Sequence, residues 1–391
     1  MQAKLLYNDR YMSDINKKAL AKHAQLRGKI EVNLKEPFTD PTMLSVFYTP
    51  GVAAVSDYVA KHPEQARDYT WLNNNVAVIS DGSAVLGLGD IGPYGALPVM
   101  EGKSLLFKHF AGIDAVPIVL DVHSVDEIVA TVTAIAPSFG GINLEDIAAP
   151  QCFEIEKRLK DTLPIPVFHD DQHGTAIVVL AGLINAVKVT NRDFSTLSIV
   201  VSGVGSAGVA IMKLLKTYDK NIRIVAVDSK GVISKDRADL NSTKKLLLSD
   251  DVIDGSIAGD LSAVMKDADV FIGVSLGGLV SRSMVASMKT NSIIFAMANP
   301  TPEIMPDEAK DAGAAVVATG RSDFPNQINN ALCFPGVFRG ALDNRVRDIT
   351  EDHKLQAAKA IAKLVEEPTA DCVIPSVMDE RLVPTISEVI R

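Results

Sequence analysis

The stretch "LSIVVSGVGSAGVAIMKLL" (197–215) decides the fold class of this 391-residue chain. It begins as an apolar run typical of a buried strand and continues as an apolar helix. Between the two, Gly203, Gly205 and Gly208 have the spacing G-x-G-x-x-G. A second apolar run, "IRIVAVD", then ends at Asp228, 20 residues after Gly208. A glycine loop between strand and helix, followed at this distance by an acidic residue, is typical of a dinucleotide-binding Rossmann unit.

Each glycine of this loop has a separate physical purpose. Gly203 permits the tight turn, Gly205 lets the backbone approach a pyrophosphate, and Gly208 lets the helix lie close to the strand. The free N–H groups at the start of the helix would bind the phosphates. The residues predicted to bind the cofactor are Gly203, Val204, Gly205, Ser206, Ala207, Gly208 and Asp228.

The choice of nucleotide rests on the end of the second strand. The carboxylate of Asp228 could accept hydrogen bonds from the adenosine ribose, which favours NAD. The next two residues, Ser229 and Lys230, could instead bind the 2′-phosphate of NADP. The sequence therefore favours NAD and leaves NADP open.

Outward from this loop, short apolar runs alternate with longer helical stretches. Strands are predicted at 76–80, 115–122, 165–168, 197–203, 222–228, 269–275, 292–298 and 314–320. Continuous apolar strands favour a parallel sheet covered on both faces, and the alternation with helices favours an α/β fold. The polar stretch 189–196 is the best candidate for a boundary between two domains. We predict two domains, 1–185 and 186–391, of which the second is a Rossmann-type doubly wound parallel sheet with C-terminal helices.

The composition is that of a globular enzyme, with 47% hydrophobic and 22% charged residues. A net charge of −9 argues against nucleic acid or an anionic membrane as the main partner. The first residues contain no apolar core of signal-peptide length, and no apolar run reaches the roughly 18 residues of a membrane span. Cys152, Cys333 and Cys372 are far apart and form no C-x-x-C pair, which favours reduced thiols and a cytoplasmic location.

Two acidic pairs stand in apolar sequence. Glu145 and Asp146 follow "GGINL", and Asp170 and Asp171 lie within "VFHDDQHGTA" (167–176). Clustered carboxylates suit Mg²⁺ or Mn²⁺, which prefer oxygen ligands. Adjacent acids diverge on regular structure, so they can bind one ion only from a strand end or a turn.

The same segment allows a different interpretation. His169 and His173 are spaced i, i+4, so "HDDQH" is similar to the H-E-x-x-H signature of zinc hydrolases. That signature lies inside a helix, whereas Pro164 and Pro166 predict a strand directly before this motif. A dinucleotide loop also has no place in a hydrolase, so zinc hydrolysis is a remote alternative.

Seven ordered motifs between about 47 and 336 resemble the malic enzymes, especially the short bacterial type. They are "YTPGVA", "SDGSAVLGLGDIGPYGALPVMEGK", "GGINLEDIAAP", "PVFHDDQHGTA", "SGVGSAGVAI", "FAMANPTPEI" and "ATGRSDFPNQINNALCFPG". The resemblance implies a general acid at Tyr48 and a general base at Lys103. It implies divalent-metal ligands at Glu145, Asp146 and Asp171, with Asp170 as a proton relay or support.

The resemblance also implies that Asn299 contacts the nicotinamide or the substrate, and that Lys103 and Asn330 contact the substrate. Longer members have an arginine near the position of Ala84, so another group must bind one substrate carboxylate here. The implied reaction converts (S)-malate to pyruvate and CO₂ with reduction of NAD(P)⁺, using Mn²⁺ or Mg²⁺. A metal-dependent oxaloacetate decarboxylase on the same fold is the nearer alternative, and a homodimer is the expected assembly.

Overall fold

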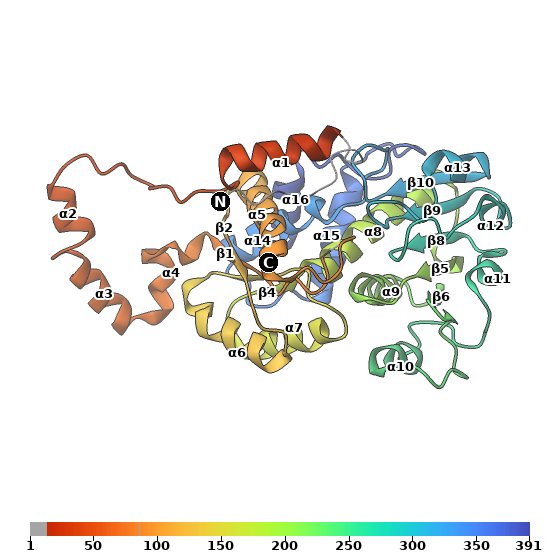
Figure 1. Cartoon of the computed structure of the whole chain (residues 1–391), viewed down its shortest axis with the longest axis horizontal. Helices are drawn as coiled ribbons and strands as arrows, with labels where there is room; N and C mark the ends of the chain where they lie inside the picture. The colour runs from red at the N-terminus through yellow and green to blue at the C-terminus, as the bar shows by residue number, and fades with distance from the viewer. Residues whose placement is uncertain (1–13, 86) are drawn as a thin grey trace, which may run out of the picture.

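The computed structural model describes residues 14–391 except residue 86. The N-terminal stretch in which no signal peptide is expected therefore lies largely outside the described residues. The described chain forms two parallel sheets that are joined by a long helix and covered by further helices (Figure 1). The α/β architecture predicted from the sequence is confirmed.

The first sheet has the order β2-β1-β3-β4, and all its neighbouring strands are parallel. Its strands are β1 (Asn75–Ser80), β2 (Asp114–Val119), β3 (Ile142–Leu144) and β4 (Val167–His169). Alternate side chains of β1 enter two cores: Val76 and Val78 pack with α5 (Gly92–Ala111), and Ala77 and Ile79 pack with α6 (Val125–Ile135) and α7 (Gln151–Thr162).

The second sheet has the order β10-β9-β8-β5-β6-β7. Its strands are β5 (Ser198–Ser202), β6 (Arg223–Asp228), β7 (Gly231–Val232), β8 (Val270–Gly273), β9 (Ser292–Ala296) and β10 (Ala314–Thr319). Only the short β7 is antiparallel among them. The chain winds outward from β5 in both directions, so the switch point of this doubly wound sheet lies between β5 and β8.

Helices cover both faces of the second sheet. On one face lie α8 (Asp170–Val189) and α9 (Ser206–Tyr218), which pack against each other. The other face is covered by α11 (Leu261–Met265), α12 (Arg282–Ala286) and α13 (Pro306–Asp311). Outside these layers, α10 (Ser242–Ser249) follows β7.

Helix α8 links the two sheets. One apolar cluster extends from Val78 of the first sheet through Ile177 of α8 to Ile199 of the second. In the described part of the chain, α8 alone has the length and apolarity of a membrane span, but it lies inside the protein and we interpret it as a core helix. The predicted domain boundary at residue 185 falls within α8.

The C-terminal helices return to the first half of the chain. They are α14 (Phe334–Asp343), α15 (Glu351–Lys363) and α16 (Leu382–Val389). Helix α14 packs against α5 and α16, and α15 packs against α8. These contacts tie the end of the chain to both sheets.

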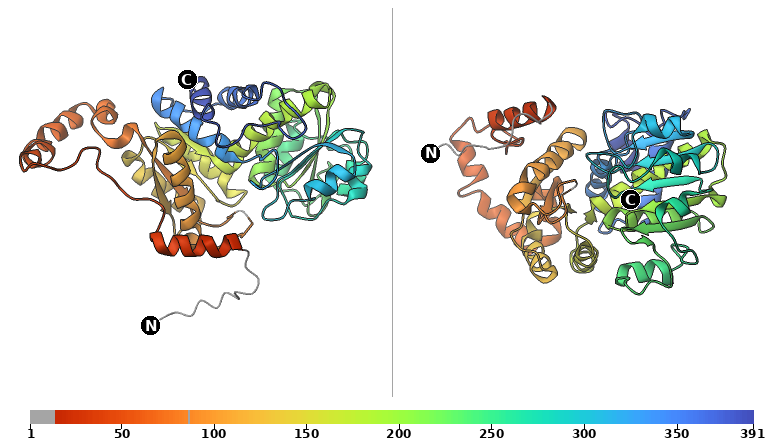
Figure 2. Two further views of the ribbon diagram at one scale, coloured as in Figure 1. Left: turned by 90° about the horizontal axis from the view of Figure 1, so that it is seen from above. Right: turned by 45° about the vertical axis from the view of Figure 1, so that its right-hand side comes forward.

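The first described helices lie at the edge of this body, where Arg67 donates to the carbonyl oxygen of Leu342 at 2.9 Å. They are α1 (Asp14–Leu26), α2 (Thr42–Phe47), α3 (Val52–Lys61) and α4 (Ala66–Tyr69). None of these four contains a buried residue. Figures 1 and 2 show α2 and α3 as an arm that projects away from α5 and both sheets.

All eight predicted strands are present, and each predicted range overlaps its observed strand. The sequence analysis missed β3 and β7. β7 has only two residues, and Asn143 interrupts the apolar residues of β3, so neither strand shows a hydrophobic pattern.

Candidate active site

The carboxyl edge of the first sheet gathers the predicted catalytic and metal-binding groups. Because its strands are parallel, the segments that follow β3 and β4 emerge at the same edge. Glu145 and Asp146 directly follow β3, while Asp170 and Asp171 begin α8 directly after β4. The two acidic pairs thus meet although they lie 25 residues apart, and the backbone N–H of Asp146 donates to Asp171 Oδ2 at 2.7 Å.

Lys103 enters this cluster from the middle of α5. Its Nζ lies 2.5 Å from Asp170 Oδ2 and 3.1 Å from Glu145 Oε1. The ammonium also lies over the ring of Phe334, 4.7 Å from the ring centroid. Only 14% of the Lys103 side chain is exposed, whereas Glu145 and Asp170 are fully buried. The structure therefore brings together a lysine and two carboxylates predicted from sequence.

The charges of this cluster do not balance. Burial lowers the pKa of Lys103, but Asp170, Glu145 and Asp171 together outweigh that effect and raise it above the usual lysine value. Burial raises the pKa of Glu145, and the repulsion of the neighbouring carboxylates adds to that, so one ammonium does not offset them. Burial lowers the pKa of Lys103 as expected from the sequence, but the three carboxylates reverse the net direction. Lys103 can act as a base only when another cation compensates the acids.

The chemistry of the cluster fits a hard divalent cation. Its donors are carboxylate oxygens, which Mg²⁺ and Mn²⁺ prefer, and their excess negative charge attracts a cation. Asp170 Oδ1 is buried without a hydrogen-bond partner, as is Asn143 Oδ1 beside it on β3. Within residues 14–391, leaving out 86, no three acidic, imidazole or thiol side chains surround a common point. The donor set is thus suited to the ion, and the side chains would have to turn toward it.

The two histidines of "HDDQH" do not form a zinc pair. His169 ends β4 and His173 lies in the first turn of α8, so the two do not share a helix. His173 Nε2 is already bound to Glu156, at 2.8 Å from Oε1 and 2.9 Å from Oε2. The zinc-hydrolase alternative is wrong, because the motif spans a strand and a helix start.

Gly174 is a functional candidate that the sequence analysis missed. A Cβ atom at this position would lie 1.9 Å from Asp170 Oδ1 and 3.2 Å from Asn330 Cβ. The close approach therefore requires glycine, and it places Asn330 beside the acidic cluster. Asn299 lies further along, where a Cβ at Gly87 would be 2.8 Å from its carbonyl oxygen. The glycine-rich loop of the first half thus touches the Asn299 segment of the second.

Tyr48 does not join this cluster within one chain. It follows α2 on the projecting arm, and 65% of it is exposed. Figures 1 and 2 show this arm on the far side of the first sheet from the second sheet. The predicted general acid and general base therefore lie apart in the monomer.

The dinucleotide loop has the geometry that its glycines suggest. Gly203 has φ +108°, and a Cβ there would lie 2.5 Å from the carbonyl oxygen of Val274. A Cβ at Gly208 would lie 1.9 Å from the carbonyl oxygen of Gly203, so helix and strand approach closely. Around Gly205 no atom lies within 4 Å of such a Cβ. Val204 and Ser206–Gly208 complete the loop at the switch point, with the α9 N–H groups at its start.

Asp228 ends β6 in a cationic environment. Arg237 Nη1 donates to its Oδ1 at 2.8 Å, and Lys244 Nζ donates to its Oδ2 at 2.6 Å. Burial raises the pKa of Asp228, but these two partners lower it more. The carboxylate is therefore ionised, and its negative charge is offset by the two neighbouring cations. Lys230 is paired with Asp239 at 2.8 Å. Arg237 and Lys244 were not found from the sequence, because residues 9 and 16 positions away show no local pattern with Asp228.

Asn143 is the other residue that the sequence analysis missed at this edge. Its Nδ2 donates to Glu145 Oε1 at 2.7 Å and orients that carboxylate. The signal was present, since an asparagine stood among apolar residues directly before the acidic pair.

Comparison with known proteins identifies the family of the chain. The family description "Malic enzyme, N-terminal domain" matches residues 27–160, and "Malic enzyme, NAD binding domain" matches residues 172–389. The bifunctional malic/malolactic enzyme of Bacillus subtilis (strain 168) is 51% identical over 383 residues, which cover 96% of this chain and 92% of that protein. The NADP-dependent malic enzyme of Rhizobium meliloti (strain 1021) is 47% identical over 95% of this chain and 49% of its own length.

Solved structures give the same result. The crystal structure of the NAD-dependent malic enzyme from Thermotoga maritima superposes with a TM-score of 0.91 at 46% identity, covering 95% of this chain and 98% of that one. Matches of this extent to both domains, together with the shared fold, show that the chain belongs to the malic enzyme family.

Proposed function

We propose that this protein catalyses the oxidative decarboxylation of (S)-malate to pyruvate and CO₂ with reduction of NAD(P)⁺. The observation that carries the proposal is Lys103, buried between Glu145 and Asp170 in the same chain as the glycine loop at 203–208. The carboxylates around Lys103 outnumber its single positive charge. A divalent ion bound to them would offset the excess negative charge and allow Lys103 to act as a base. The relatives named above include enzymes of both nucleotide types.

In this proposal each residue has a limited task. Lys103 accepts the proton of the C2 hydroxyl, and Asp170, at 2.5 Å, receives or stabilises that proton. Glu145, Asp146 and Asp171 would hold Mn²⁺ or Mg²⁺, while the loop at 203–208 would hold the nucleotide. When bound, the ion supplies a Lewis acid for decarboxylation, and the nucleotide supplies the hydride acceptor.

A direct assay tests the proposal. Purified protein with malate, Mn²⁺ and NAD⁺ or NADP⁺ should form reduced nucleotide, and chelation should stop the reaction. Asp171→Asn should lose activity because an amide replaces one carboxylate donor, and its Mn²⁺ affinity should fall. Formation of CO₂ from oxaloacetate without any reduced nucleotide from malate would instead identify an oxaloacetate decarboxylase.

We also propose that the protein works as a homodimer in which the arm of one copy reaches the site of the other. Tyr48 lies on that arm, away from Lys103, so it can serve as the acid only in a second copy. The arm has the apolar surface for such a contact, since its large exposed side chains include Leu44, Val46, Phe47, Val52 and Val55.

A cytoplasmic location remains a proposal. It is supported by the three free cysteines, Cys152, Cys333 and Cys372, because a reducing compartment keeps such thiols unpaired. Cell fractionation with an antibody to the protein would test it.

A further inference from the structure

Glu156 is a buried carboxylate that the proposed reaction does not use. It lies on α7 and is 6% exposed. Its partners all come from the segment that carries the metal-site acids. His173 Nε2 approaches both oxygens, Gln172 Nε2 donates to Oε2 at 3.2 Å, and the backbone N–H of His169 donates to Oε1 at 3.4 Å.

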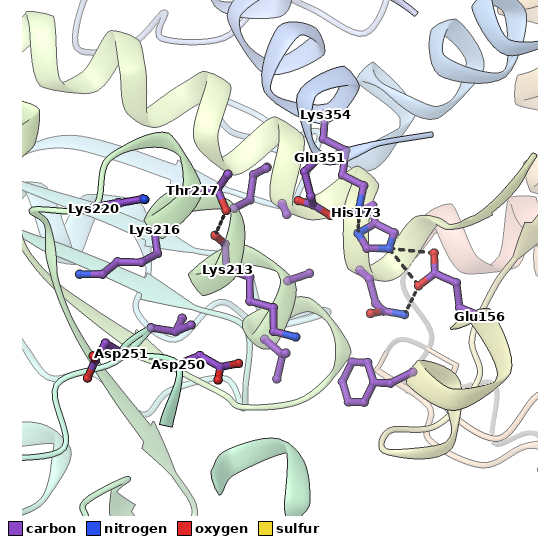
Figure 3. Close-up of a pocket in the computed structure, with 17 residues that line it drawn as sticks. Glu156, His173, Lys213, Lys216, Thr217, Lys220, Asp250, Asp251, Glu351 and Lys354 are labelled. Atoms are coloured by element: carbon purple, nitrogen blue, oxygen red, sulfur yellow. Dashed lines mark hydrogen bonds and ion pairs between the residues drawn. The ribbon is translucent and has the colours of Figure 1, made fainter. Parts of the chain in front are cut away.

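A lysine completes this network from the C-terminal part of the chain. Lys354 on α15, itself 3% exposed, places its Nζ 3.0 Å from His173 Nδ1 and 2.6 Å from Glu351 Oε1. An ammonium only donates, so Nδ1 is the acceptor and the imidazole proton is on Nε2, which donates to Glu156. The two hydrogen bonds therefore run in one direction, from Lys354 to His173 and from His173 to Glu156 (Figure 3).

The charge state agrees with this direction. Burial raises the pKa of Glu156, but His173, His169 and Lys354 outweigh it and hold the pKa at about 2. A buried ionised carboxylate adds little net stability compared with an apolar side chain of the same size. Its use must therefore be sought in what it orients.

We propose that Glu156 is a positioning residue that fixes the turn from β4 into α8 and so aims Asp170 and Asp171 at the metal site. The two carboxylate oxygens of Glu156 accept hydrogen bonds from His169, Gln172 and His173, which are the residues on either side of the two aspartates. The turn can then shift only if these hydrogen bonds break. This inference deepens the proposed function and rests on it.

The surroundings make this role testable without unfolding the protein. Glu156, Gln172, His173 and Lys354 line a cavity of about 860 Å³ between α7, α8, α9 and α15 (Figure 3). Water in this cavity can reach groups that lose a partner. A substitution at Glu156 therefore need not leave dry, unpaired donors.

The experiment compares Glu156→Gln with a matched buried carboxylate. Asp269, 3% exposed, accepts from Lys289 Nζ at 2.8 Å and from the backbone N–H of Ser198 at 2.9 Å, far from the acidic cluster. Wild type, Glu156→Gln and Asp269→Asn are measured for Mn²⁺ affinity by titration calorimetry, NAD⁺ affinity, malate kinetics and thermal unfolding. Partners that orient metal ligands typically contribute about 10–100-fold to metal affinity, so we expect a loss of that size in Glu156→Gln. Its NAD⁺ affinity should change less than twofold, and Asp269→Asn should lose thermal stability only.

The outcomes separate the two proposals. If wild type neither binds Mn²⁺ nor oxidises malate, the proposed function fails before any variant is compared. If wild type is active and folded Glu156→Gln binds Mn²⁺ as tightly, the positioning role is overturned. If Glu156→Gln does not fold, His173→Leu and His173→Gln replace it: glutamine can still donate to Glu156, so it should keep the Mn²⁺ affinity that leucine loses. Equal affinity in those two variants would also refute the role.

Discussion

At the scale of single residues, the charge around Lys103 governs what the site can do. The ammonium of Lys103 touches both Glu145 and Asp170, and these acids raise its pKa. A raised pKa favours the protonated lysine, whereas a general base must be deprotonated near neutral pH. The acids that hold Lys103 in place therefore also make it dependent on a second cation.

Replacement of Lys103 tests this directly. Lys103→Ala should lower kcat for malate oxidation by about 10²–10⁴-fold, the usual contribution of a general base. Its Mn²⁺ affinity should not fall, because removing an ammonium leaves more negative charge around the ion. Lys108→Ala, an exposed lysine on the same helix, is the control and should behave as wild type. A loss below tenfold would point to Asp170 as the base.

Arg237 gives the second residue-scale prediction. Its guanidinium binds Asp228 with both Nη atoms, at 2.8 and 3.1 Å, where an adenosine ribose would lie in a Rossmann unit. Arg237→Gln should reduce kcat/KM for NADP⁺ at least about tenfold more than for NAD⁺, because a 2′-phosphate needs that charge. Lys230→Gln is the comparison: the sequence suggested Lys230 as a 2′-phosphate ligand, but Lys230 pairs with Asp239 and not with Asp228, so we expect its effect on NADP⁺ to be smaller. If the ratio of kcat/KM for NADP⁺ to that for NAD⁺ did not change, Arg237 would have no role in nucleotide preference.

At the scale of elements, the start of α8 determines the shape of the site. Within one turn it carries Asp170 and Asp171 toward the acidic cluster, His173 toward Glu156, and Gly174 against Asp170. The dense packing of this turn leaves no room for a side chain at position 174.

Gly174→Ala should therefore damage the site more than the fold. Its Cβ would overlap Asp170 Oδ1 and push that carboxylate away from Lys103, so we expect kcat to fall by about 10²-fold or more. Gly182→Ala on the same helix is the control, because its Cβ would meet the end of the Ile328 side chain at 3.1 Å and the Phe295 ring at 3.4 Å, away from the acidic cluster. Assays of malate oxidation and thermal unfolding compare the two. Full activity in Gly174→Ala would mean that Asp170 has another productive position.

At the scale of the whole molecule, the arm at α2 and α3 separates Tyr48 from the rest of the site. Residues of this arm contain no buried side chain in the monomer, although several are large and apolar. Such a surface is typical of an interface between subunits. The dimer proposed above would both cover it and complete the site.

Mixing two inactive variants tests this arrangement. Tyr48→Phe and Lys103→Ala should each be nearly inactive, but after joint refolding the mixed dimer would contain one site with both intact residues. Random pairing gives mixed dimers in about half of the molecules, so about a quarter of wild-type activity should return. If Tyr48 served its own chain, every site in the mixture would lack one residue and no activity would return.

The sequence determined the α/β class, eight of the ten described strands, the dinucleotide loop and the identity of the acids, because these depend on local pattern and residue type. It also indicated that Glu145 and Asp146 need a strand end or a turn to bind one ion, although the strand before them, β3, was not predicted. Only the tertiary structure decided which charges meet: Lys103 with Glu145 and Asp170, Asp228 with Arg237 and Lys244, and Glu156 with His173 and Lys354. It likewise decided that Tyr48 lies away from Lys103. These pairings join residues far apart in the chain, and they follow from the parallel order of the strands and the packing of α5, α7 and α15, which no local pattern contains.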